Sequence, residues 1–238
     1  MIRYSTIRDK NPREIVLLRA SGCKWKKCTF CDYHLDSSKD EESNYILNKK
    51  VLEKVTGEYR HLEVINSGSF CELDEQTIEL IRTICKEKSI AILHFECHYL
   101  YRNRIAALRE RFESVGTELK IKTGVETFDF EFRENVLKKG IPASDPKEIA
   151  KYFDECCLLF GISGQTAKSM TEDIETGLSH FERVCVNIMT KNTTNILPDQ
   201  DVISIFKKEV MPNFANNDRV DILISNTDFG VGEKGEEP

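Results

Sequence analysis

The sequence has no long hydrophobic run. Its longest apolar stretches, IVLL at residues 15–18 and CCLLF at residues 156–160, are far shorter than the roughly 20 apolar residues that a transmembrane helix requires. Charged residues interrupt the segment before residue 15, so it has no apolar stretch of the kind found in a secretory signal peptide. We therefore expect a cytoplasmic protein that does not cross a membrane.

Positive charge is in the minority. The chain has 34 Lys and Arg against 40 Asp and Glu, a net charge of −6, and this balance argues against a large nucleic-acid footprint. Internal repeats and low-complexity tracts are also missing. With 40% hydrophobic and 31% charged residues, the composition is typical of a globular protein with a core. We expect one domain over residues 1–230 and a flexible, charged tail over residues 231–238.

Short apolar runs alternate with amphipathic stretches along the chain. This alternation predicts βαβ units and a parallel sheet, which right-handed crossovers would curl into a barrel or partial barrel. The expected strands are residues 14–21, 61–69, 89–96, 118–126, 156–164, 183–189 and 220–226. The expected helices are residues 46–60, 74–88 with Asp74 as N-cap, 102–114, 129–139 closed by Gly140, 166–181 and 199–209.

Nine cysteines fall into two groups. Because a cytosolic chain keeps its thiols reduced, a disulfide framework is not expected. Six cysteines lie in or beside apolar runs and are interpreted as small buried hydrophobic residues: Cys71, Cys85, Cys97, Cys156, Cys157 and Cys185. The other three, Cys23, Cys28 and Cys31, lie on one loop with the spacing C-x4-C-x2-C.

Three interpretations of this loop remain open from spacing alone. Zinc could be bound by the three cysteines and His34, although a structural zinc site usually has two cysteine pairs and no second CxxC is present. The three thiols could also bind no metal. In the third interpretation they bind a [4Fe–4S] cluster and leave one iron open for a small molecule. The loop follows the first strand of the predicted sheet, at the edge where parallel barrels have their active sites.

This three-cysteine loop, with Phe30 directly before the last cysteine, resembles that of the radical S-adenosylmethionine (SAM) enzymes. Their commonest spacing is C-x3-C-x2-C, so this chain has one extra residue. The resemblance covers about residues 15–190 and implies a partial (βα)6-type barrel completed by the C-terminal helix and strand. It also implies a [4Fe–4S] cluster bound by Cys23, Cys28 and Cys31, and shielding of that cluster from water by Phe30.

Four segments, each after a predicted strand, are similar to SAM-binding segments of these enzymes. The segment NSGSF at residues 66–70 resembles the loop that holds the methionine amino group, and Glu96 follows the next strand. The segment from Gly124 to Gly140 resembles one in which a glutamate accepts from the ribose hydroxyls and a basic residue pairs with the methionine carboxylate. GISGQT at residues 161–166 resembles the turn against adenine. The implied SAM-binding residues are Phe30, Ser67, Gly68, Ser69, Glu96, Glu126, Arg133, Lys138, Ser163 and Gly164.

The resemblance also implies a reaction. A 5′-deoxyadenosyl radical, formed by reductive cleavage of SAM, would abstract a hydrogen atom from the substrate, with flavodoxin or ferredoxin as the electron donor. No second cysteine cluster is present, which argues against sulfur insertion. Within the superfamily the segments at residues 67–70 and 124–140 are most similar to those of the archaeosine- and queuosine-related enzymes, among them the queuine lyases. These break the C–N bond of queuine and release 7-aminomethyl-7-deazaguanine.

A deazaguanine substrate would need polar and aromatic partners at the strand ends. Its ring N–H and amino groups require acceptors, because a buried donor without a partner costs about 1–3 kcal/mol. The candidates are Tyr33, His34, His98, Asn187, Asn226, Asp228 and Phe229, with Asp228 as the carboxylate acceptor and Phe229 stacking on the ring. Another radical SAM enzyme, acting on tRNA, a peptide or a small metabolite, stays open as an alternative. So does a non-catalytic zinc or iron–sulfur module.

Overall fold

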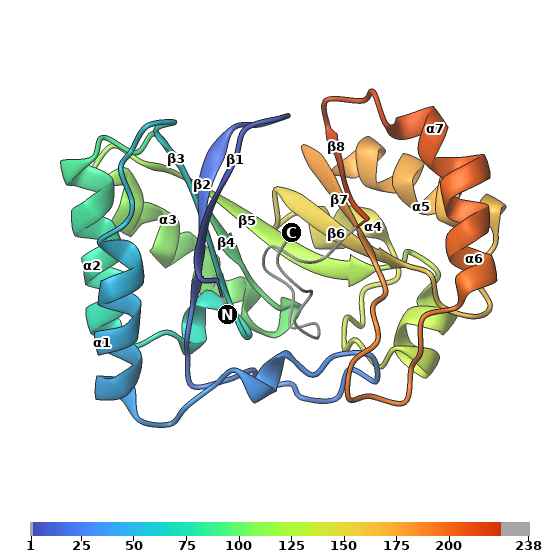
Figure 1. The fold of residues 1–238 in the computed structure, drawn as a ribbon, viewed down its shortest axis with the longest axis horizontal. Coiled ribbons are helices and arrows are strands. Elements are labelled where there is room, and N and C mark those ends of the chain that lie inside the picture. The colour runs from blue at the N-terminus through green and yellow to red at the C-terminus, as the bar shows by residue number, and fades with distance from the viewer. Residues whose placement is uncertain (1, 225–238) are drawn as a thin grey trace. The chain divides into compact units, whose positions relative to one another are not determined.

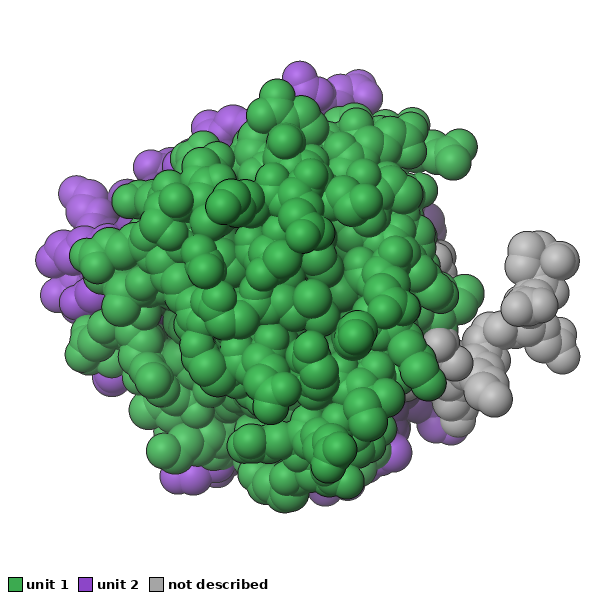
Figure 2. Space-filling model, turned by 90° about the vertical axis from the view of Figure 1, so that its left-hand side faces the viewer, with its two compact units in different colours: residues 1–26, 33–122 green, residues 27–32, 123–238 purple. Residues whose placement is uncertain are grey.

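The computed structural model describes residues 2–224 and divides the chain into two compact units. The first unit comprises Met1–Lys26 and Tyr33–Lys122, and the second comprises Lys27–Asp32 and Thr123–Pro238. They are coloured separately in Figure 2. The cysteine loop is shared, because residues 27–32 belong to the second unit although both neighbouring segments belong to the first. The predicted single domain over residues 1–230 stays a prediction, and the predicted tail at residues 231–238 lies outside the described residues.

The first unit is built on a sheet whose strand β2 has an antiparallel neighbour on one side and a parallel neighbour on the other (Figure 1). β1 pairs with β2 in the register Tyr4↔Val16. Parallel pairing then continues from β2 through β3 and β4 to β5. The strands are β1 (Tyr4–Ile7), β2 (Arg13–Leu18), β3 (His61–Asn66), β4 (Ile92–Glu96) and β5 (Glu118–Glu126), of which β5 continues into the second unit.

Helices pack on one face of these strands. Val16, Leu18, Leu62 and Val64 are fully buried on that face, and the ring of Phe95 lies 5.9 Å from that of Phe112 on α3. The α-helices are α1 (Glu41–Leu52), α2 (Glu75–Glu87) and α3 (Ile105–Glu113). Short 3₁₀ helices follow three of the strands, namely η1 (Tyr33–Leu35), η2 (Phe70–Glu72) and η3 (Tyr99–Arg104).

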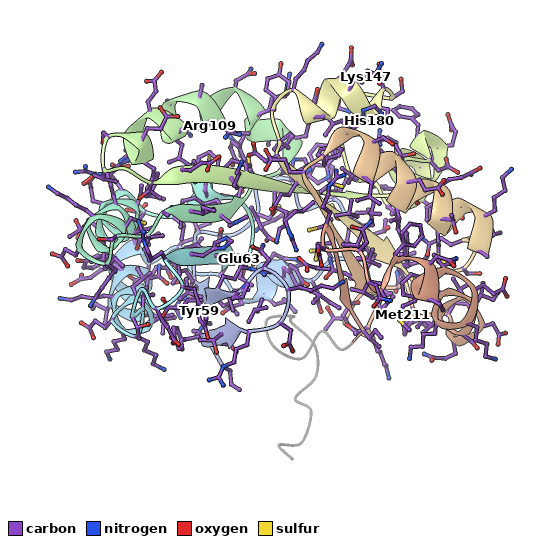
Figure 3. All side chains as sticks on the ribbon, turned by 90° about the horizontal axis from the view of Figure 1, so that it is seen from above. Tyr59, Glu63, Arg109, Lys147, His180 and Met211 are labelled. Atoms are coloured by element: carbon purple, nitrogen blue, oxygen red, sulfur yellow. The ribbon has the colours of Figure 1, made fainter. Side chains whose placement is uncertain are left out.

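The opposite face of the first unit's strands carries buried charged and polar side chains beside apolar ones such as Ile15. Glu63 on β3 lies among these strands (Figure 3) and accepts from Arg13 Nε and from Lys122 Nζ, each at 2.5 Å. The neighbouring imidazoles of His61 and His94 are stacked, with ring centroids 4.6 Å apart. Alternation along each strand therefore separates an apolar face under the helices from a face that carries buried charge.

The second unit repeats the parallel arrangement. β6 (Glu155–Phe160) pairs with β7 (Arg183–Ile188), which pairs with β8 (Val220–Leu223). The ring of Phe160 on β6 lies 5.4 Å from that of Phe206, between α6 and α7. The helices are α4 (Pro146–Ala150), α5 (Ala167–His180), α6 (Gln200–Ile205) and α7 (Met211–Phe214), with two π-helical segments, η4 (Phe132–Val136) and η5 (Phe206–Val210).

The predicted α/β fold class with parallel strands is confirmed, and the order of strands in the sheet is their order in the chain, β1 to β8. All seven predicted strands are present, and β1 is the strand that the sequence prediction missed. Asp74 is the N-cap of α2, as predicted, and accepts from Thr77 N at 2.7 Å. None of the helices in residues 2–224 is long and apolar enough to span a membrane.

The predicted helix boundaries were wrong in several places, and the helix predicted at residues 199–209 continues through η5 and α7 to Phe214. The helix predicted at residues 46–60 is α1, which begins earlier because Asp40 is its N-cap and accepts from Ser43 N at 3.0 Å. It ends at Leu52, before the turn at Gly57, whose φ is +81°. The helix predicted at residues 129–139 is reduced to the π-helical segment η4, although Gly140 follows it with a positive φ of 74°, as predicted.

Candidate functional site

The cysteine loop is divided between the units, with Cys23 in the first and Cys28 and Cys31 in the second. All three are half-buried thiols, and the nine cysteines of the described chain form no disulfide. No three His, Cys, Asp or Glu side chains within residues 2–224 are gathered as a metal site would require. The three thiols are nevertheless the donor type that an iron–sulfur cluster takes, and they lie within nine positions of the chain.

The other six cysteines behave as predicted for packing residues. Five are buried and Cys71 is half-buried. Burial raises the pKa of Cys71 to about 11 and that of Cys85 to about 12, and it also raises the pKa of Cys97 and Cys156. Thiols with such pKa values are protonated at neutral pH, and a protonated thiol is a poor metal ligand.

In the first unit, a loop after β3 packs against the residues around Cys23. This loop contains the predicted residues Ser67, Gly68 and Ser69 and leads into η2. Glu72, the last residue of η2, binds both the loop and the cysteine segment: its carboxylate accepts from Ser69 N at 2.5 Å and from Lys24 N at 2.7 Å. Burial raises the pKa of Glu72, and these two N–H donors oppose that rise. Glu72 is not among the residues predicted from the sequence.

Asn66 begins this loop with an acceptor that lacks a donor. Its Nδ2 donates to Ser69 O at 3.1 Å, but its buried Oδ1 has no hydrogen-bond partner among the described residues. A buried acceptor without a donor costs free energy unless a ligand supplies one. An ammonium or amino group is a ligand of the kind that would satisfy it.

The next strand in the chain, β4, ends at the predicted residue Glu96, and the predicted residue His98 follows as the N-cap of η3. Glu96 is half-buried. His98 is part of the loop framework: its backbone N donates to Ser69 Oγ at 2.9 Å, and its ring stacks on Trp25, with centroids 5.5 Å apart. Its Nδ1 also accepts from Leu100 N at 3.1 Å, which caps η3. The contact with Trp25 connects His98 to the cysteine loop.

In the second unit, residues 27–32 form hydrogen bonds with two other segments, residues 136–137 and residues 192–193. Thr29 donates through N to Leu137 O at 3.1 Å and through Oγ1 to Val136 O at 2.7 Å. Asn192 Nδ2 donates to Phe30 O at 2.7 Å, and Thr193 N donates to Asp32 Oδ2 at 3.0 Å. The Phe30 ring packs against a buried cluster of Leu137, Leu159, Ile162 and Met189.

An ion pair lies beside this segment. Lys139 Nζ donates to Glu126 Oε1 at 2.7 Å and lies 5.7 Å from the centroid of the Phe30 ring. Burial alone would lower the pKa of Lys139, but the Glu126 carboxylate and the thiolates of Cys28 and Cys31 raise it above its ordinary value. Glu126 itself has a strained φ of +70°. Glu126 is one of the predicted SAM-binding residues, and its partner Lys139 follows the predicted Lys138 in the chain.

Two of the predicted carboxylate-binding residues have other surroundings. Arg133 is fully buried, and its guanidinium donates to Thr127 O, Ile141 O, Ala143 O and the Glu134 carboxylate. These bonds engage the guanidinium within its own unit, and the contact of Arg133 with the methionine carboxylate stays a prediction. Lys138 is exposed.

The turn after β6 has the expected form. Gly161 and Gly164 have φ values of +91° and +98°, and the Gln165 side chain closes the turn by accepting from Ile162 N at 3.0 Å and donating to Leu159 O at 2.8 Å. The predicted contact residues Ser163 and Gly164 are exposed. Backbone held open in this way is accessible to a flat ligand.

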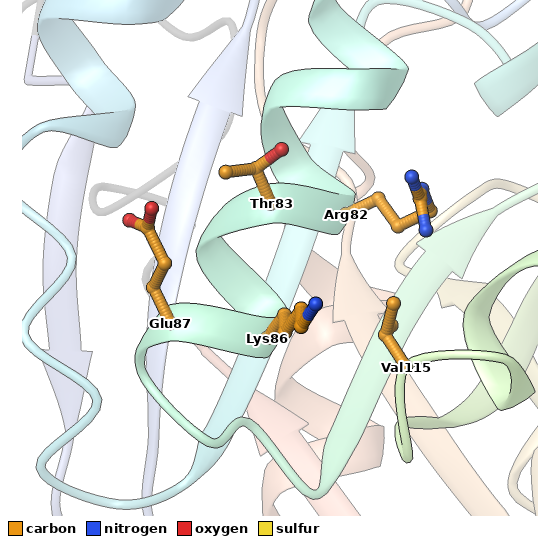
Figure 4. A pocket seen from close by; sticks show the side chains of 5 residues that line it. All are labelled: Arg82, Thr83, Lys86, Glu87 and Val115. Carbon is orange, nitrogen blue, oxygen red and sulfur yellow. The ribbon is translucent and has the colours of Figure 1, made fainter.

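The remaining candidates belong to different elements of the two units. Tyr33 is exposed, His34 is half-buried beside it in η1, and Asn187 is half-buried on β7. The described residues do not include Asn226, Asp228 and Phe229. A surface hollow of about 450 Å³ is lined by Arg82, Thr83, Lys86, Glu87 and Val115 (Figure 4). These residues precede β4 and β5 in the chain, at the end of the strands opposite to the cysteine loop, so this hollow is not the candidate site.

No family model and no curated protein matches the sequence, but a solved structure does. The queuine lyase from Clostridium spiroforme, solved with SAM and queuine bound, is 47% identical, has a TM-score of 0.92, and the match covers 98% of this chain and 100% of that one. The chain belongs to the queuine lyase family. The predicted resemblance to radical SAM enzymes, and among them to queuine lyases, is thereby confirmed.

A second, more distantly related solved structure has a similar fold. Streptococcus suis SuiB, solved with SAM bound, is 11% identical with a TM-score of 0.54, and the match covers 87% of this chain and 46% of that one. Identity this low supports the fold alone. The predicted partial barrel of the radical SAM type agrees with both neighbours.

Proposed function

We propose that this protein is a radical SAM enzyme that breaks the C–N bond of queuine and releases 7-aminomethyl-7-deazaguanine for salvage. The observation that carries the proposal is the full-length match to the Clostridium spiroforme queuine lyase with SAM and queuine bound. Nearly half of the residues are identical over the whole chain. Two proteins this similar could act on different substrate classes only if many binding-site residues differed while the fold stayed the same.

The cofactor of this proposal is a [4Fe–4S] cluster held by Cys23, Cys28 and Cys31. Three thiolates leave one iron for the amino and carboxylate groups of SAM. When bound, the cluster supplies the electron that splits the sulfonium of SAM, with flavodoxin or ferredoxin as the reductant. The chain itself orients SAM and queuine and excludes water from the radical, and Phe30 next to Cys31 contributes to that exclusion.

The residues proposed to bind SAM follow four successive strands in the chain. Support comes from the acceptor Asn66 Oδ1 and the loop Ser67–Ser69 for the amino group, and from Glu126 with Lys139 after β5 for the ribose and the methionine carboxylate. Ser163 and Gly164 offer open backbone for the adenine. Glu96 is proposed as a further polar contact, and exposed Lys138 as an outer one.

Queuine is proposed to be the substrate, bound by the polar and aromatic side chains that the sequence indicates. Tyr33, His34, His98 and Asn187 stay candidates, as do Asn226, Asp228 and Phe229. The deazaguanine edge presents N–H donors that need an acceptor, because burying them without one is costly. Asp228 remains the proposed acceptor. Asp228→Asn retains the shape of the side chain but replaces one acceptor oxygen with an NH2 donor, so it should weaken queuine binding.

An anaerobic assay tests the function. Protein reconstituted with iron and sulfide should bind about four irons per chain and, with SAM, dithionite and queuine, form both 5′-deoxyadenosine and 7-aminomethyl-7-deazaguanine in mass spectra. Ala at Cys23, Cys28 or Cys31 should abolish cluster assembly, whereas Cys71→Ala, at another half-buried thiol, should not. Formation of 5′-deoxyadenosine without the amine would refute the lyase assignment. One tightly bound zinc and no iron would refute the radical chemistry.

A further inference from the structure

Glu72 binds the backbone on both sides of Cys23. Its carbonyl oxygen accepts from Ser21 N at 3.0 Å and from Ser21 Oγ at 3.1 Å. Its carboxylate Oε1 accepts from Lys24 N at 2.7 Å. Because Ser21 and Lys24 flank the short segment that carries Cys23, this one residue fixes the segment at both ends.

The same carboxylate fixes the loops after β3 and β4. Glu72 Oε2 accepts from Ser69 N at 2.5 Å, and Ser69 Oγ accepts from His98 N at 2.9 Å. Tyr101, in η3 after β4, donates its hydroxyl to Glu72 Oε1 at 3.2 Å. Three loops that follow three consecutive strands of the first unit therefore meet at one buried carboxylate.

The packing between two of these loops leaves no spare room. A Cβ atom on Gly68 would lie 1.9 Å from Glu72 Oε2 and 3.1 Å from the Cα of Cys23. The backbone of the loop at residues 66–69 thus lies directly on Cys23, and the carboxylate fills the space beside it. Glu72 is only 8% exposed, and a carboxylate this buried is retained because backbone N–H groups satisfy it.

We propose that Glu72 is a positioning residue that holds the SAM-binding loop at residues 66–69 at a fixed spacing from Cys23. The inference rests on the proposed function, which assigns the amino group of SAM to this loop and the cluster to Cys23. The carboxylate oxygens of Glu72 already accept from Lys24 N, Ser69 N and the Tyr101 hydroxyl, so this role requires no direct contact of Glu72 with either group. Glu72 acts through the two backbone N–H bonds, so the property it controls is the affinity for the amino-acid part of SAM.

Glu72→Gln is the variant that tests this role, and Glu14→Gln is its matched control. An amide retains one acceptor atom, so one of the N–H groups of Lys24 and Ser69 loses its acceptor in the first variant. Glu14, at the start of β2, is also buried and accepts from two backbone N–H groups, Thr56 and Gly57, each at 2.7 Å, and from the Tyr4 hydroxyl at 2.8 Å. It lies at the strand end opposite to the cysteine loop.

Two measurements separate positioning from general loss of stability. In the metal-free protein, hydrogen exchange should accelerate at residues 21–26 and 66–72 in Glu72→Gln, but not in Glu14→Gln. In the cluster-loaded protein, Glu72→Gln should retain its iron, bind SAM roughly tenfold or more weakly, and show a smaller change in the electron paramagnetic resonance (EPR) spectrum when SAM is added. Tyr101→Phe removes a single hydrogen bond to Glu72. It should accelerate hydrogen exchange and weaken SAM binding as Glu72→Gln does, but to a smaller extent.

The outcomes distinguish this inference from the proposed function. If wild-type protein cleaves queuine and the two glutamine variants bind SAM equally well, the positioning role is wrong and the lyase assignment stands. If wild-type protein assembles a cluster but neither binds nor cleaves SAM, the proposed function fails first. Should Glu72→Gln not fold, a normal SAM affinity in Tyr101→Phe, together with unchanged exchange at residues 21–26, refutes the role.

Discussion

Lys139 donates a hydrogen bond to the Glu126 carboxylate across 2.7 Å, and both side chains are almost completely withdrawn from solvent, at 12% and 9% exposure. A side chain on Gly124 would displace this pair, because its Cβ would lie 2.3 Å from Glu126 Oε1 and 2.8 Å from Lys139 Nζ. The thiolates of Cys28 and Cys31 are among the charges that raise the pKa of Lys139. A permanent cation is therefore held next to two of the proposed cluster ligands.

Removing this cation should lower the reduction potential of the cluster. A positive charge stabilises the reduced, more negative state, and a nearby charge in a low-dielectric site acts with little screening. For Lys139→Gln, which retains a hydrogen-bond donor for Glu126, we expect a decrease on the order of 60 mV, equivalent to tenfold in the one-electron equilibrium. Redox titration of the reconstituted protein, followed by EPR spectroscopy, measures it.

The neighbouring lysine provides the comparison. Lys138 is exposed, so solvent and salt screen its charge, and Lys138→Gln should leave the potential unchanged. Equal potentials for the two variants would show that the buried lysine does not act on the cluster. A lower reduction potential in Lys138→Gln alone would show that Lys138, and not Lys139, acts on the cluster.

Substitution of Arg133 should reduce stability without changing SAM affinity. Arg133→Lys cannot reach Thr127 O, Ile141 O and Ala143 O together, and it leaves buried carbonyls without donors. The expected loss is about 3 kcal/mol in the free energy of unfolding, measured by urea denaturation of the metal-free protein. A weaker SAM affinity with undiminished stability would instead support a contact with the methionine carboxylate.

The sequence was informative wherever burial produced a pattern. Strands such as Glu155–Phe160, buried at every position, contain an apolar run that can hardly be misread. The strand β1 has only half-buried residues, so no run marks it. The acidic start of α1 after Asp40 carries no apolar periodicity, and the prediction therefore began five residues too late, at Ile46.

Side-chain selection within the site could not be obtained from spacing. The cysteine loop is a local motif, and its three residues are specified by distance along the chain. Which of Lys138 and Lys139 is withdrawn from solvent depends on the π-helical turn at Phe132–Val136, which changes the register after a segment predicted as regular helix. The Glu72 carboxylate accepts from Lys24 N, which lies 48 positions earlier in the chain. No periodicity encodes such a contact.

Comparing Glu63 with Glu79 tests how much a buried ion pair contributes to stability relative to an exposed one. Each carboxylate binds two cations, Glu63 with 5% and Glu79 with 43% of the side chain exposed. Glu63→Gln leaves Arg13 and Lys122 buried without a counter-charge and should cost about 3–5 kcal/mol of stability. Glu79→Gln should cost less than about 1 kcal/mol, because solvent screens the surface pairs. Similar losses in thermal denaturation would show that the first unit's polar face is hydrated.

The stability of the second unit should depend on pH through Asp173. Burial raises the pKa of Asp173 from 3.8 to about 6, although the carboxylate accepts from Phe128 N at 2.6 Å. A raised pKa means that the folded state binds the proton more tightly than the unfolded state. The stabilisation is complete below about pH 3.8 and is lost as pH rises through about 6, with an upper limit of about 3 kcal/mol.

Asp173→Asn isolates this contribution, because an amide oxygen can still accept from Phe128 N and carries no charge at any pH. The difference in unfolding free energy between wild type and variant, measured with urea on the metal-free protein, should change between pH 4 and pH 7. Relative to the variant, wild-type protein should be most stable at the acidic end and lose that advantage toward neutral pH. If the two stability curves run parallel, the Asp173 carboxylate is solvated in the folded state and its burial imposes no penalty on the charge.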